Sequence, residues 1–321
     1  MAGFPSERDL MFSALALFLL VAVDDVEPVS HVTTVAPIEA SGGVALGPDG
    51  YLYVSDFGSS LMTAGGSSIY RISIDGAHIE VLSDEFGGAS GNGFGADGYL
   101  YQSDVGRGEA YRVELDGQRT RLADGLHSPV GIVSSENGVT YIAECTANEI
   151  ARINRDGAVE RIATGMPLNC PNGLTFGPDG NLYAANFRDG AIVRISIETG
   201  DMSLFARVPG GGNGHIRWGN GRFYIASFQG NQIYSVSMEG EICHIAGSGE
   251  PDNRDGEGLS AALFRPNGVA ISPDGDTLYT NTISEIVEPF DPRLHPNHVR
   301  RVDGLLSLLD CPPERIVAPQ T

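Results

Sequence analysis

The sequence predicts an all-β fold, a six-bladed β-propeller with four-stranded blades, from three observations. A short unit that ends in Leu-Tyr or a close variant recurs six times, and its starts are 50, 38, 42, 41 and 54 residues apart. Runs of alternating apolar and polar residues follow each unit, as expected for half-buried strands. The 43 glycines accompany a hydrophobic content of 41%, which excludes a disordered chain and indicates many short strands joined by turns.

The first two strands of each blade are expected to form a hairpin. In each copy a turn of the Asp-Gly or Asn-Gly type separates two short apolar runs, as in tight β-hairpins. The six copies read GVALGPDGYLY from Gly43, GFGADGYLY from Gly93, GIVSSENGVTY from Gly131, GLTFGPDGNLY from Gly173, GHIRWGNGRFY from Gly214 and GVAISPDGDTLY from Gly268.

The third and fourth strands follow at regular distances. A turn that contains glycine separates them in each of the first five blades, and their period-two alternation predicts one buried face. Third strands are expected to begin at Ser68, Glu109, Glu149, Ala191 and Gln232, and fourth strands at Ile79, Arg119, Val159, Met202 and Ile242.

The sixth copy lacks a fourth strand, and the N-terminal part of the chain supplies a candidate for it. A third strand is expected over 297–302, and the segment 31–36 has the fourth-strand pattern. Pairing of the two closes the ring and removes the open sheet edges. The predicted organisation is therefore a signal peptide or disordered extension over 1–25, the propeller over 30–303 and a C-terminal tail over 304–321.

The N-terminal segment contains one apolar run, from Leu10 to Val23. The run is too short to cross a bilayer and fits the apolar region of a signal peptide, although Glu7 and Asp9 precede it in place of a positively charged region. Export would make the protein secreted or periplasmic. A disordered extension, or a true start at Met11, would leave it cytoplasmic.

The charge of the chain excludes several function classes. All 20 basic residues are arginine, against 41 acidic residues, and the formal net charge is −21. Without lysine, Schiff-base chemistry and a phosphate-binding P-loop are excluded. The acidic balance argues against nucleic acid as a partner, and no segment has membrane-spanning length. A small-molecule substrate, or a protein partner if the chain is a scaffold, is expected instead.

The four cysteines have no metal-binding spacing. Cys145, Cys170, Cys243 and Cys311 form no Cys-x-x-Cys pair, which argues against a zinc ribbon. Cys145 and Cys170 are expected in loops of neighbouring blades at the same end, where a disulfide could join them. The alternative is that the four are small buried apolar residues.

Polar residues are expected to gather where the first strands begin, at one mouth of the central channel. The residue before the repeat glycine is asparagine in four copies: Asn92, Asn172, Asn213 and Asn267. The second strands end in the same region, at Asp56, Asp104, Glu144, Asn186, Ser227 and Thr282. Such oxygen atoms could hold Ca²⁺ or bond a polar ligand. The alternatives are asparagines that serve turns and acids that fix loops.

Two further residues follow Asn213 in the first strand of blade five. Alternation places His215 and Arg217 on the side of this strand opposite Gly214 and Ile216. His215 could act as a general base, and Arg217 could hold a substrate carboxylate. The alternative for His215 is a packed or solvated strand residue. Two insertions, over 57–67 and 283–296, are expected to flank the mouth and form a lid.

Two segments resemble known families. Residues 245–279 resemble an NHL repeat, and 170–187 resemble one blade of the SMP-30/gluconolactonase/LRE-like propellers. This resemblance implies a six-bladed propeller that acts at the channel mouth, and it places Asn172 on a metal-ligand asparagine. Asn213 stands where that family usually has a metal-ligand aspartate, and Gly42 where it has a glutamate. Both departures weaken a calcium site.

The resulting hypothesis is a small-molecule hydrolase of the SMP-30/lactonase type. A divalent cation, with Ca²⁺ the expected ion, would be held by Asn172 and Asn213 and would polarise a lactone or ester carbonyl. The residues expected to activate water are Asp104, Glu144 or His215, and those expected to bind substrate are Asn92, Asn267 and Arg217. No Gly-x-Ser-x-Gly or His-Glu-x-x-His motif is present. The alternative is a non-catalytic NHL-type binding scaffold.

Overall fold

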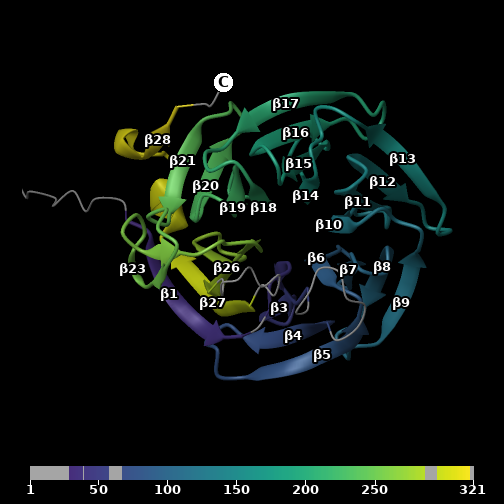
Figure 1. The fold of residues 1–321 in the computed structure, drawn as a ribbon, viewed down its shortest axis with the longest axis horizontal. Coiled ribbons are helices and arrows are strands. Elements are labelled where there is room, and N and C mark those ends of the chain that lie inside the picture. The colour runs from purple at the N-terminus through teal and green to yellow at the C-terminus, as the bar shows by residue number, and fades with distance from the viewer. Residues whose placement is uncertain (1–28, 39, 58–66, 286–294, 319–321) are drawn as a thin grey trace, which may run out of the picture.

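Six antiparallel sheets surround a central axis in the computed structural model, which describes residues 29–38, 40–57, 67–285 and 295–318 (Figure 1). The predicted six-bladed, all-β propeller is confirmed. Blades 1 to 3 consist of β2 (Val44–Leu46), β3 (Tyr51–Ser55), β4 (Ser67–Ser73) and β5 (Ile79–Phe86); β6 (Ala89–Phe94), β7 (Leu100–Asp104), β8 (Glu109–Val113) and β9 (Arg119–Ala123); and β10 (Pro129–Ser134), β11 (Thr140–Glu144), β12 (Glu149–Ile153) and β13 (Val159–Thr164).

The remaining blades follow the same order from the axis outward. Blade 4 consists of β14 (Pro171–Phe176), β15 (Leu182–Asn186), β16 (Ala191–Ile195) and β17 (Met202–Arg207). Blade 5 begins with β18 (Asn213–Gly219), β19 (Arg222–Ser227), β20 (Gln232–Ser237) and β21 (Ile242–Ala246), and blade 6 with β25 (Ala270–Ile271), β26 (Thr277–Glu285) and β27 (His295–Asp303). Short strands β22 (Asn253–Arg254), β23 (Gly256–Glu257) and β24 (Ala262–Leu263) lie in the connection between blades 5 and 6.

The N-terminal strand closes the ring, as the repeat pattern predicts. Strand β1 (His31–Pro37) pairs antiparallel with β27, so that Val32 lies opposite Val302. Strand β23 adds to the outer edge of β1. Blade 6 therefore combines residues from both parts of the chain, which joins the first and last repeats without an open edge.

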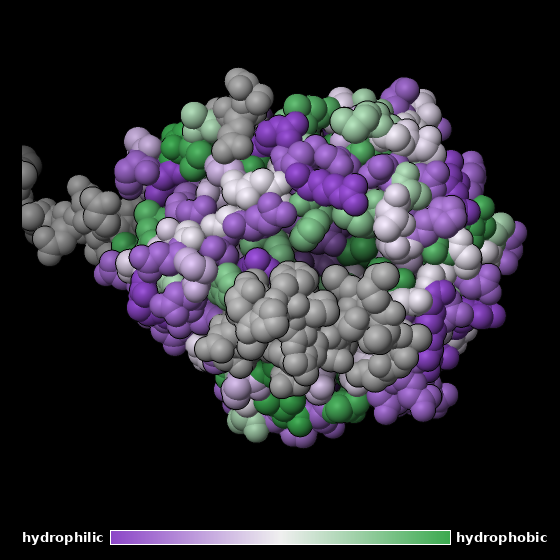
Figure 2. Space-filling model, in the orientation of Figure 1, coloured by the Kyte–Doolittle hydropathy of each residue, from purple (hydrophilic) through white to green (hydrophobic). Residues whose placement is uncertain are grey.

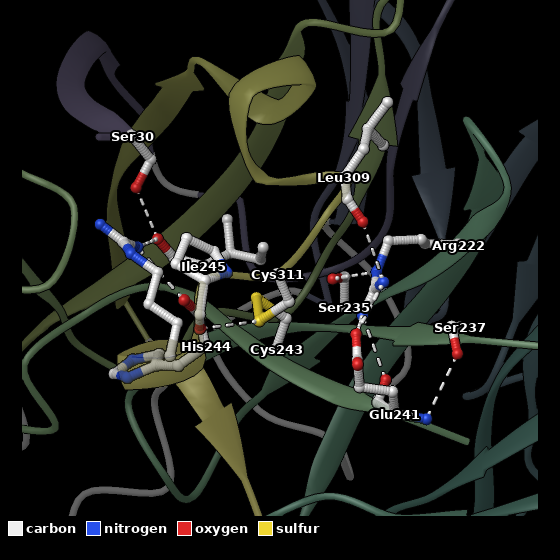
Figure 3. The surroundings of a disulfide bond; sticks show 12 residues. Ser30, Arg222, Ser235, Ser237, Glu241, Cys243, His244, Ile245, Leu309 and Cys311 are labelled. Carbon is white, nitrogen blue, oxygen red and sulfur yellow. Dashed lines mark hydrogen bonds and ion pairs between the residues drawn. A yellow bond between two sulfur atoms is a disulfide. The ribbon is translucent and has the colours of Figure 1, made fainter. Parts of the chain in front are cut away.

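The residues after Asp303 extend blade 5. The 3₁₀ turns η1 (Leu305–Leu308) and η2 (Pro313–Arg315) lead to β28 (Ile316–Val317), which pairs with β21 as a fifth strand. A disulfide joins Cys243 of β21 to Cys311 (Figure 3). The buried Arg315 donates hydrogen bonds to the carbonyls of His244 and Ile245. The C-terminal segment is thus bound to the sheet covalently and through its polar groups.

A set of polar contacts supports the hairpins formed by the first and second strands. In blade 1 Asp49, from the Pro-Asp-Gly turn, accepts hydrogen bonds from the Tyr53 hydroxyl at 2.8 Å and from Arg71 Nη2 at 2.7 Å. The same set recurs in blade 4 as Asp179, Tyr183 and Arg194. Each set links the turn to the second and third strands, so the repeated Pro-Asp-Gly and Tyr residues have a structural reason to recur.

Three expectations concern residues outside the described part of the chain. The apolar run Leu10–Val23 lies there, and so do 58–66 and 286–294, which are most of the two insertions expected to form a lid. Within the described part, no helix has the length and apolar character needed to span a membrane.

Candidate functional site

Strand pairing fixes which residues of the six first strands lie at the same depth along the axis. A tyrosine of the second strand occurs at the same place in every blade, as Tyr53, Tyr101, Tyr141, Tyr183, Tyr224 and Tyr279. The first-strand residues paired with these tyrosines are Ala45, Gly93, Val133, Thr175, Arg217 and Ala270. They define one level, and counting back along each strand leads toward the mouth.

Two residues before the first-strand residue that pairs with the tyrosine, five of the six blades have glycine. This level consists of Gly43, Gly91, Gly131, Gly173, His215 and Gly268. One residue further toward the mouth the level consists of Gly42, Ser90, Val130, Asn172, Gly214 and Asn267. His215 therefore stands in blade 5 where the other blades leave the axis free of side chains.

The prediction that four asparagines form one ring at the mouth is wrong for Asn92 and Asn213. The Asn92 amide points between blades 1 and 2, where Nδ2 donates to the Tyr53 carbonyl at 3.0 Å and to Ser55 Oγ at 2.8 Å. Asn213 is fully buried, and its Nδ2 lies 3.5 Å from the Ala191 carbonyl of blade 4. These two side chains fill spaces between blades and do not reach the mouth.

Asn172 and Asn267 do lie at the mouth. Each amide nitrogen donates to a main-chain carbonyl, that of Asn172 to Asn213 at 3.2 Å and that of Asn267 to Ser41. These bonds fix the orientation of both amides. Among the described residues no donor reaches either Oδ1 atom, so both oxygens can accept a hydrogen bond from a ligand.

The mouth is a cavity of about 260 Å³ whose walls are mainly apolar. Its lining consists of Phe57, Val105, Val130, Phe187 and Phe228, the disulfide-bonded Cys145 and Cys170, and the polar residues Ser41, Ser128, Thr146, Asn172 and Asn267. In Figure 2 hydrophobic residues are visible beside the central hollow, and the rest of this face mixes hydrophilic and hydrophobic residues. The disulfide that the loop positions suggested is thus part of the cavity wall.

The apolar ring has a simple origin that the sequence-based alignment missed. Phe57, Val105, Cys145, Phe187 and Phe228 each directly follow the aligned residue that ends a second strand. Since successive side chains point to opposite sides, the polar end residue turns away from the mouth and its neighbour turns into it. Reading the alignment one residue further would have revealed this ring.

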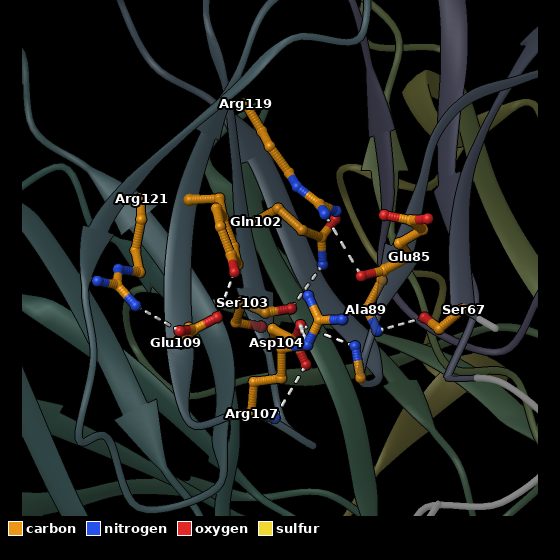
Figure 4. Close-up of polar contacts among 12 residues, drawn as sticks. Ser67, Glu85, Ala89, Gln102, Ser103, Asp104, Arg107, Glu109, Arg119 and Arg121 are labelled. Atoms are coloured by element: carbon orange, nitrogen blue, oxygen red, sulfur yellow. Dashed lines mark hydrogen bonds and ion pairs between the residues drawn. The ribbon is translucent and has the colours of Figure 1, made fainter. Parts of the chain in front are cut away.

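Asp104 ends strand β7 and is fully buried (Figure 4). Its Oδ2 accepts a hydrogen bond from the Gly87 amide at 2.8 Å, and its Oδ1 accepts one from the Arg107 amide at 3.1 Å. These bonds hold the connection that leads into blade 2. Asp104 does not line the cavity, and its role in catalysis stays a prediction.

Glu144 has the corresponding place in blade 3 and is also fully buried. It accepts a hydrogen bond from the His127 amide at 2.6 Å, and Arg161 donates to both carboxylate oxygens at 3.0 and 3.1 Å. His127, Glu144 and Glu149 offer three potential metal ligands within 4.8 Å of one another. Arg161 already supplies positive charge to this group, with its Nε 3.9 Å from Glu149, so a cation would have to compete with it.

The residues at the mouth do not fit a calcium ion. Of the two expected ligands, Asn172 lines the cavity, but the Asn213 amide points toward blade 4. No carboxylate of the described residues lines the cavity. Calcium in proteins takes six to eight oxygen ligands, usually with carboxylates among them, and neutral amides do not provide the charge that would offset its dehydration.

His215 is the one ionisable side chain at the glycine level of the axis. It is 7% exposed, its Nε2 atom has no hydrogen-bond partner, and a Cβ added to Gly91 of blade 2 would lie 2.9 Å from its Cε1. Burial, together with the charge of Arg217, lowers the pKa of His215 to about 3. The imidazole is therefore packed and neutral at physiological pH.

Arg217 reaches across the axis at the next channel-facing level. Its Nη2 donates a hydrogen bond to the Asn92 carbonyl of blade 2. The prediction that His215 and Arg217 share the side of β18 opposite Ile216 is confirmed, because Ile216 packs into the core between blades 4 and 5. Arg217 does not line the mouth cavity but lies deeper than His215.

Comparison with solved structures identifies the fold. A gluconolactonase from Xanthomonas campestris is similar, with 18% identity and a TM-score of 0.63 over 85% of this chain and 89% of that one. The chain has the six-bladed propeller fold of the gluconolactonases. No family model matches the chain, and no curated protein matches it in sequence.

Proteins with other described functions share this propeller fold. Virginiamycin B lyase from Staphylococcus aureus is 17% identical, with a TM-score of 0.58 over 85% of this chain and 99% of that one. An auxiliary nutrient binding protein from Bacteroides ovatus is 15% identical, with a TM-score of 0.66 over 91% and 77%. At these identities the likeness concerns the fold, so the function has to be argued from the residues of the site.

Proposed function

We propose that the protein binds a small, largely uncharged organic molecule in the mouth cavity. The observation that carries this proposal is the ring of apolar side chains over the two oriented amides of Asn172 and Asn267. Apolar walls with a few fixed polar groups are typical of small-molecule sites. The walls would bury hydrocarbon, and the amide oxygens would accept hydrogen bonds from hydroxyl or amide groups of the ligand.

The cavity chemistry also limits the class of ligand. About 260 Å³ suits a compact molecule of one or two rings, and a strongly charged ligand would find no counter-ion in the lining that is described. An uncharged lactone, an ester or the related alcohol satisfies these conditions. This ligand class overlaps the lactone or ester substrate expected from the sequence.

The test uses γ-nonalactone, phenyl acetate and phenylethanol as probes, with binding measured by calorimetry. Val130→Asp should abolish binding, because it places a charge in the apolar wall. Val81→Asp is the matched control, since Val81 is 54% exposed on an outer strand and should tolerate the same change. Equal binding by both variants, or no binding of any probe by the native protein, would contradict the proposal.

Hydrolysis of a lactone or ester is the second candidate function. The observation that favours it is His215, whose neutral imidazole has an unpartnered Nε2 one level beneath the mouth. An imidazole in this state can accept a proton from water. Since Nε2 is buried, water or substrate would have to reach it from the cavity. Hydrolysis therefore requires one condition more than ligand binding does.

Hydrolysis of phenyl acetate separates the two candidates. Under the hydrolase candidate His215→Gln should reduce the rate at least about a hundredfold, the rate should not change between pH 5 and 8, and EDTA should have no effect. Binding of the probes without turnover would reject hydrolysis and leave the binding proposal intact. Loss of activity with EDTA would instead support the metal-assisted reaction expected from the sequence.

We propose further that the folded protein works outside the reducing cytosol, in a secreted or periplasmic location. The support is the pairing of all four cysteines in two disulfides, Cys145–Cys170 and Cys243–Cys311. Protein taken from its native cells should not react with iodoacetamide until a reductant is added. Immediate alkylation of the cysteines would overturn this location.

A further inference from the structure

The axis has a second pocket at the end opposite the mouth. It measures about 220 Å³ and is lined by Ala45, Leu46, Phe94, Arg217, Trp218, Ala270 and Ile271. These residues belong to the later part of the first strands, beside the hairpin turns. The pocket shares no lining residue with the mouth cavity, and His215 lies between the two.

Arg217 is the one charged group in the lining of this pocket. Small neighbours at its level, Ala45, Gly93 and Ala270, leave room for the guanidinium on the axis, where a Cβ added to Gly93 would lie 2.7 Å from Nη2. The guanidinium donates one described hydrogen bond, from Nη2 to the Asn92 carbonyl. The guanidinium has five N–H donors, so most of its donor capacity remains for another group.

No carboxylate of the described residues forms an ion pair with Arg217, although two arginines that are more deeply buried, Arg222 and Arg300, have such partners. Arg300 is fully buried, and its Nη2 lies 2.7 Å from Asp255 Oδ1. Arg222 Nη1 lies 3.2 Å from Glu241 Oε1. Burial lowers the pKa of Arg217 to about 10, which leaves it charged at neutral pH. Arg217 is partly exposed where it lines the pocket, so its charge is only partly solvated and has no counter-ion among the described residues. A bound anion would supply that counter-ion.

We propose that this pocket binds an organic monocarboxylate, whose two oxygens pair with the Arg217 guanidinium. A planar carboxylate matches the guanidinium geometry through two parallel hydrogen bonds. The apolar residues Leu46, Phe94 and Ile271 would contact the hydrocarbon part of the ligand. A single cation with apolar walls suits a monoanion better than a phosphate dianion, which needs more donors and more charge to leave water.

The single tryptophan of the chain provides a direct readout. Trp218 lines the pocket beside Arg217, so its fluorescence should change when the pocket is filled. The native protein is titrated with sodium hexanoate at constant ionic strength, and calorimetry is run on the same samples. Saturable binding of hexanoate is expected, with no response to uncharged hexanamide or to matched sodium chloride.

Arg217→Met should weaken hexanoate binding at least tenfold, because it removes the cation of the pocket. The fold should be retained, since Arg217 forms no ion pair with the described residues and is only partly buried. Arg254→Met is the matched control: Arg254 is a surface residue paired with Glu250, and its loss should leave hexanoate binding unchanged. If Arg217→Met does not fold, Leu46→Glu serves instead, since an internal carboxylate beside Arg217 should compete with hexanoate and abolish its binding.

Three outcomes would overturn the proposal. They are no saturable binding of hexanoate, equal binding by native protein and Arg217→Met, or binding of inorganic phosphate in preference to hexanoate. Val130→Asp, which tests the mouth cavity, should leave hexanoate binding unchanged. The two sites can therefore fail or succeed independently.

Discussion

At the scale of single residues, His215 is the most unusual side chain of the axis. Five blades have glycine at this level, and only blade 5 places a ring there. Its imidazole is buried, neutral and without a partner at Nε2. A polar atom left unbonded in the protein interior costs free energy, which points to a use beyond filling space.

His215 should make the stability of the protein sensitive to acid. Its pKa is about 3 in the folded state against 6.5 for an ordinary histidine, so the unfolded chain takes up a proton first as the pH falls. The free energy of unfolding should therefore decrease between pH 7 and 5 by about 2 kcal/mol more for native protein than for His215→Gln. Urea denaturation at both pH values measures this difference, and parallel losses in the two proteins would contradict the burial of a neutral imidazole.

At the scale of elements, the hairpins of the first and second strands depend on a hydrogen-bonded turn carboxylate whose side chain is 26% exposed in blade 4. Burial alone would raise the pKa of Asp179, but hydrogen bonds from Asn181 and Arg194, among others, outweigh it and lower the pKa to about 2. The ionised carboxylate thus stabilises the folded hairpin above its ordinary pKa of 3.8, and this contribution is lost as the pH falls toward 2.

Replacement of this carboxylate should destabilise blade 4. Asp179→Ala is expected to cost about 2 kcal/mol, since it leaves the Tyr183 hydroxyl and Arg194 without their acceptor. Asp156→Ala is the control, because Asp156 accepts a single described hydrogen bond, from the Ala158 amide of an exposed turn. Thermal unfolding should show a clear loss for the first variant and a small one for the second.

The same scale explains why the sequence predicts the blades but not the register of the site. Blade 2 has two candidate glycines, and alignment on Gly93 in place of Gly91 moves Asn92 two residues toward the mouth. In blade 5 the hairpin turn is one residue shorter than in blade 4, as the pairs Trp218–Phe223 and Phe176–Leu182 show. Motif spacing does not reveal such shifts, whereas the tyrosine of the second strand gives the register in every blade.

At the scale of the whole molecule, both ends of the described chain reinforce the ring. Strand β1 completes blade 6, and the C-terminal segment is joined to blade 5 by Cys243–Cys311 across 68 residues of sequence. Ser30, just before β1, donates a hydrogen bond to the Ile245 carbonyl that Arg315 also contacts. The repeats predict the closure by β1, but a two-residue strand outside the repeat, such as β28, has no periodic pattern to reveal it.

Removal of the Cys243–Cys311 disulfide should lower stability without loss of the ligand sites. The double variant Cys243→Ala/Cys311→Ala is expected to lose about 3 kcal/mol of unfolding free energy, since the unfolded chain is no longer cross-linked. Cys145→Ala/Cys170→Ala is the comparison, because this pair lines the mouth and its removal should also change probe binding. Chemical denaturation together with probe calorimetry distinguishes the two effects.

The glycine level has a further consequence for how this molecule could change. The side chain of His215 lies between the mouth cavity, which is apolar with two amide oxygens, and the second pocket, which is lined by the guanidinium of Arg217. The substitution His215→Gly, which gives blade 5 the glycine of the other five blades, would join the two cavities into one continuous channel. If both proposed ligands bind, His215→Gly would convert two sites for compact ligands into one site for a long amphiphile. Its carboxylate would pair with Arg217, and its chain would extend toward Phe57, Phe187 and Phe228 at the mouth.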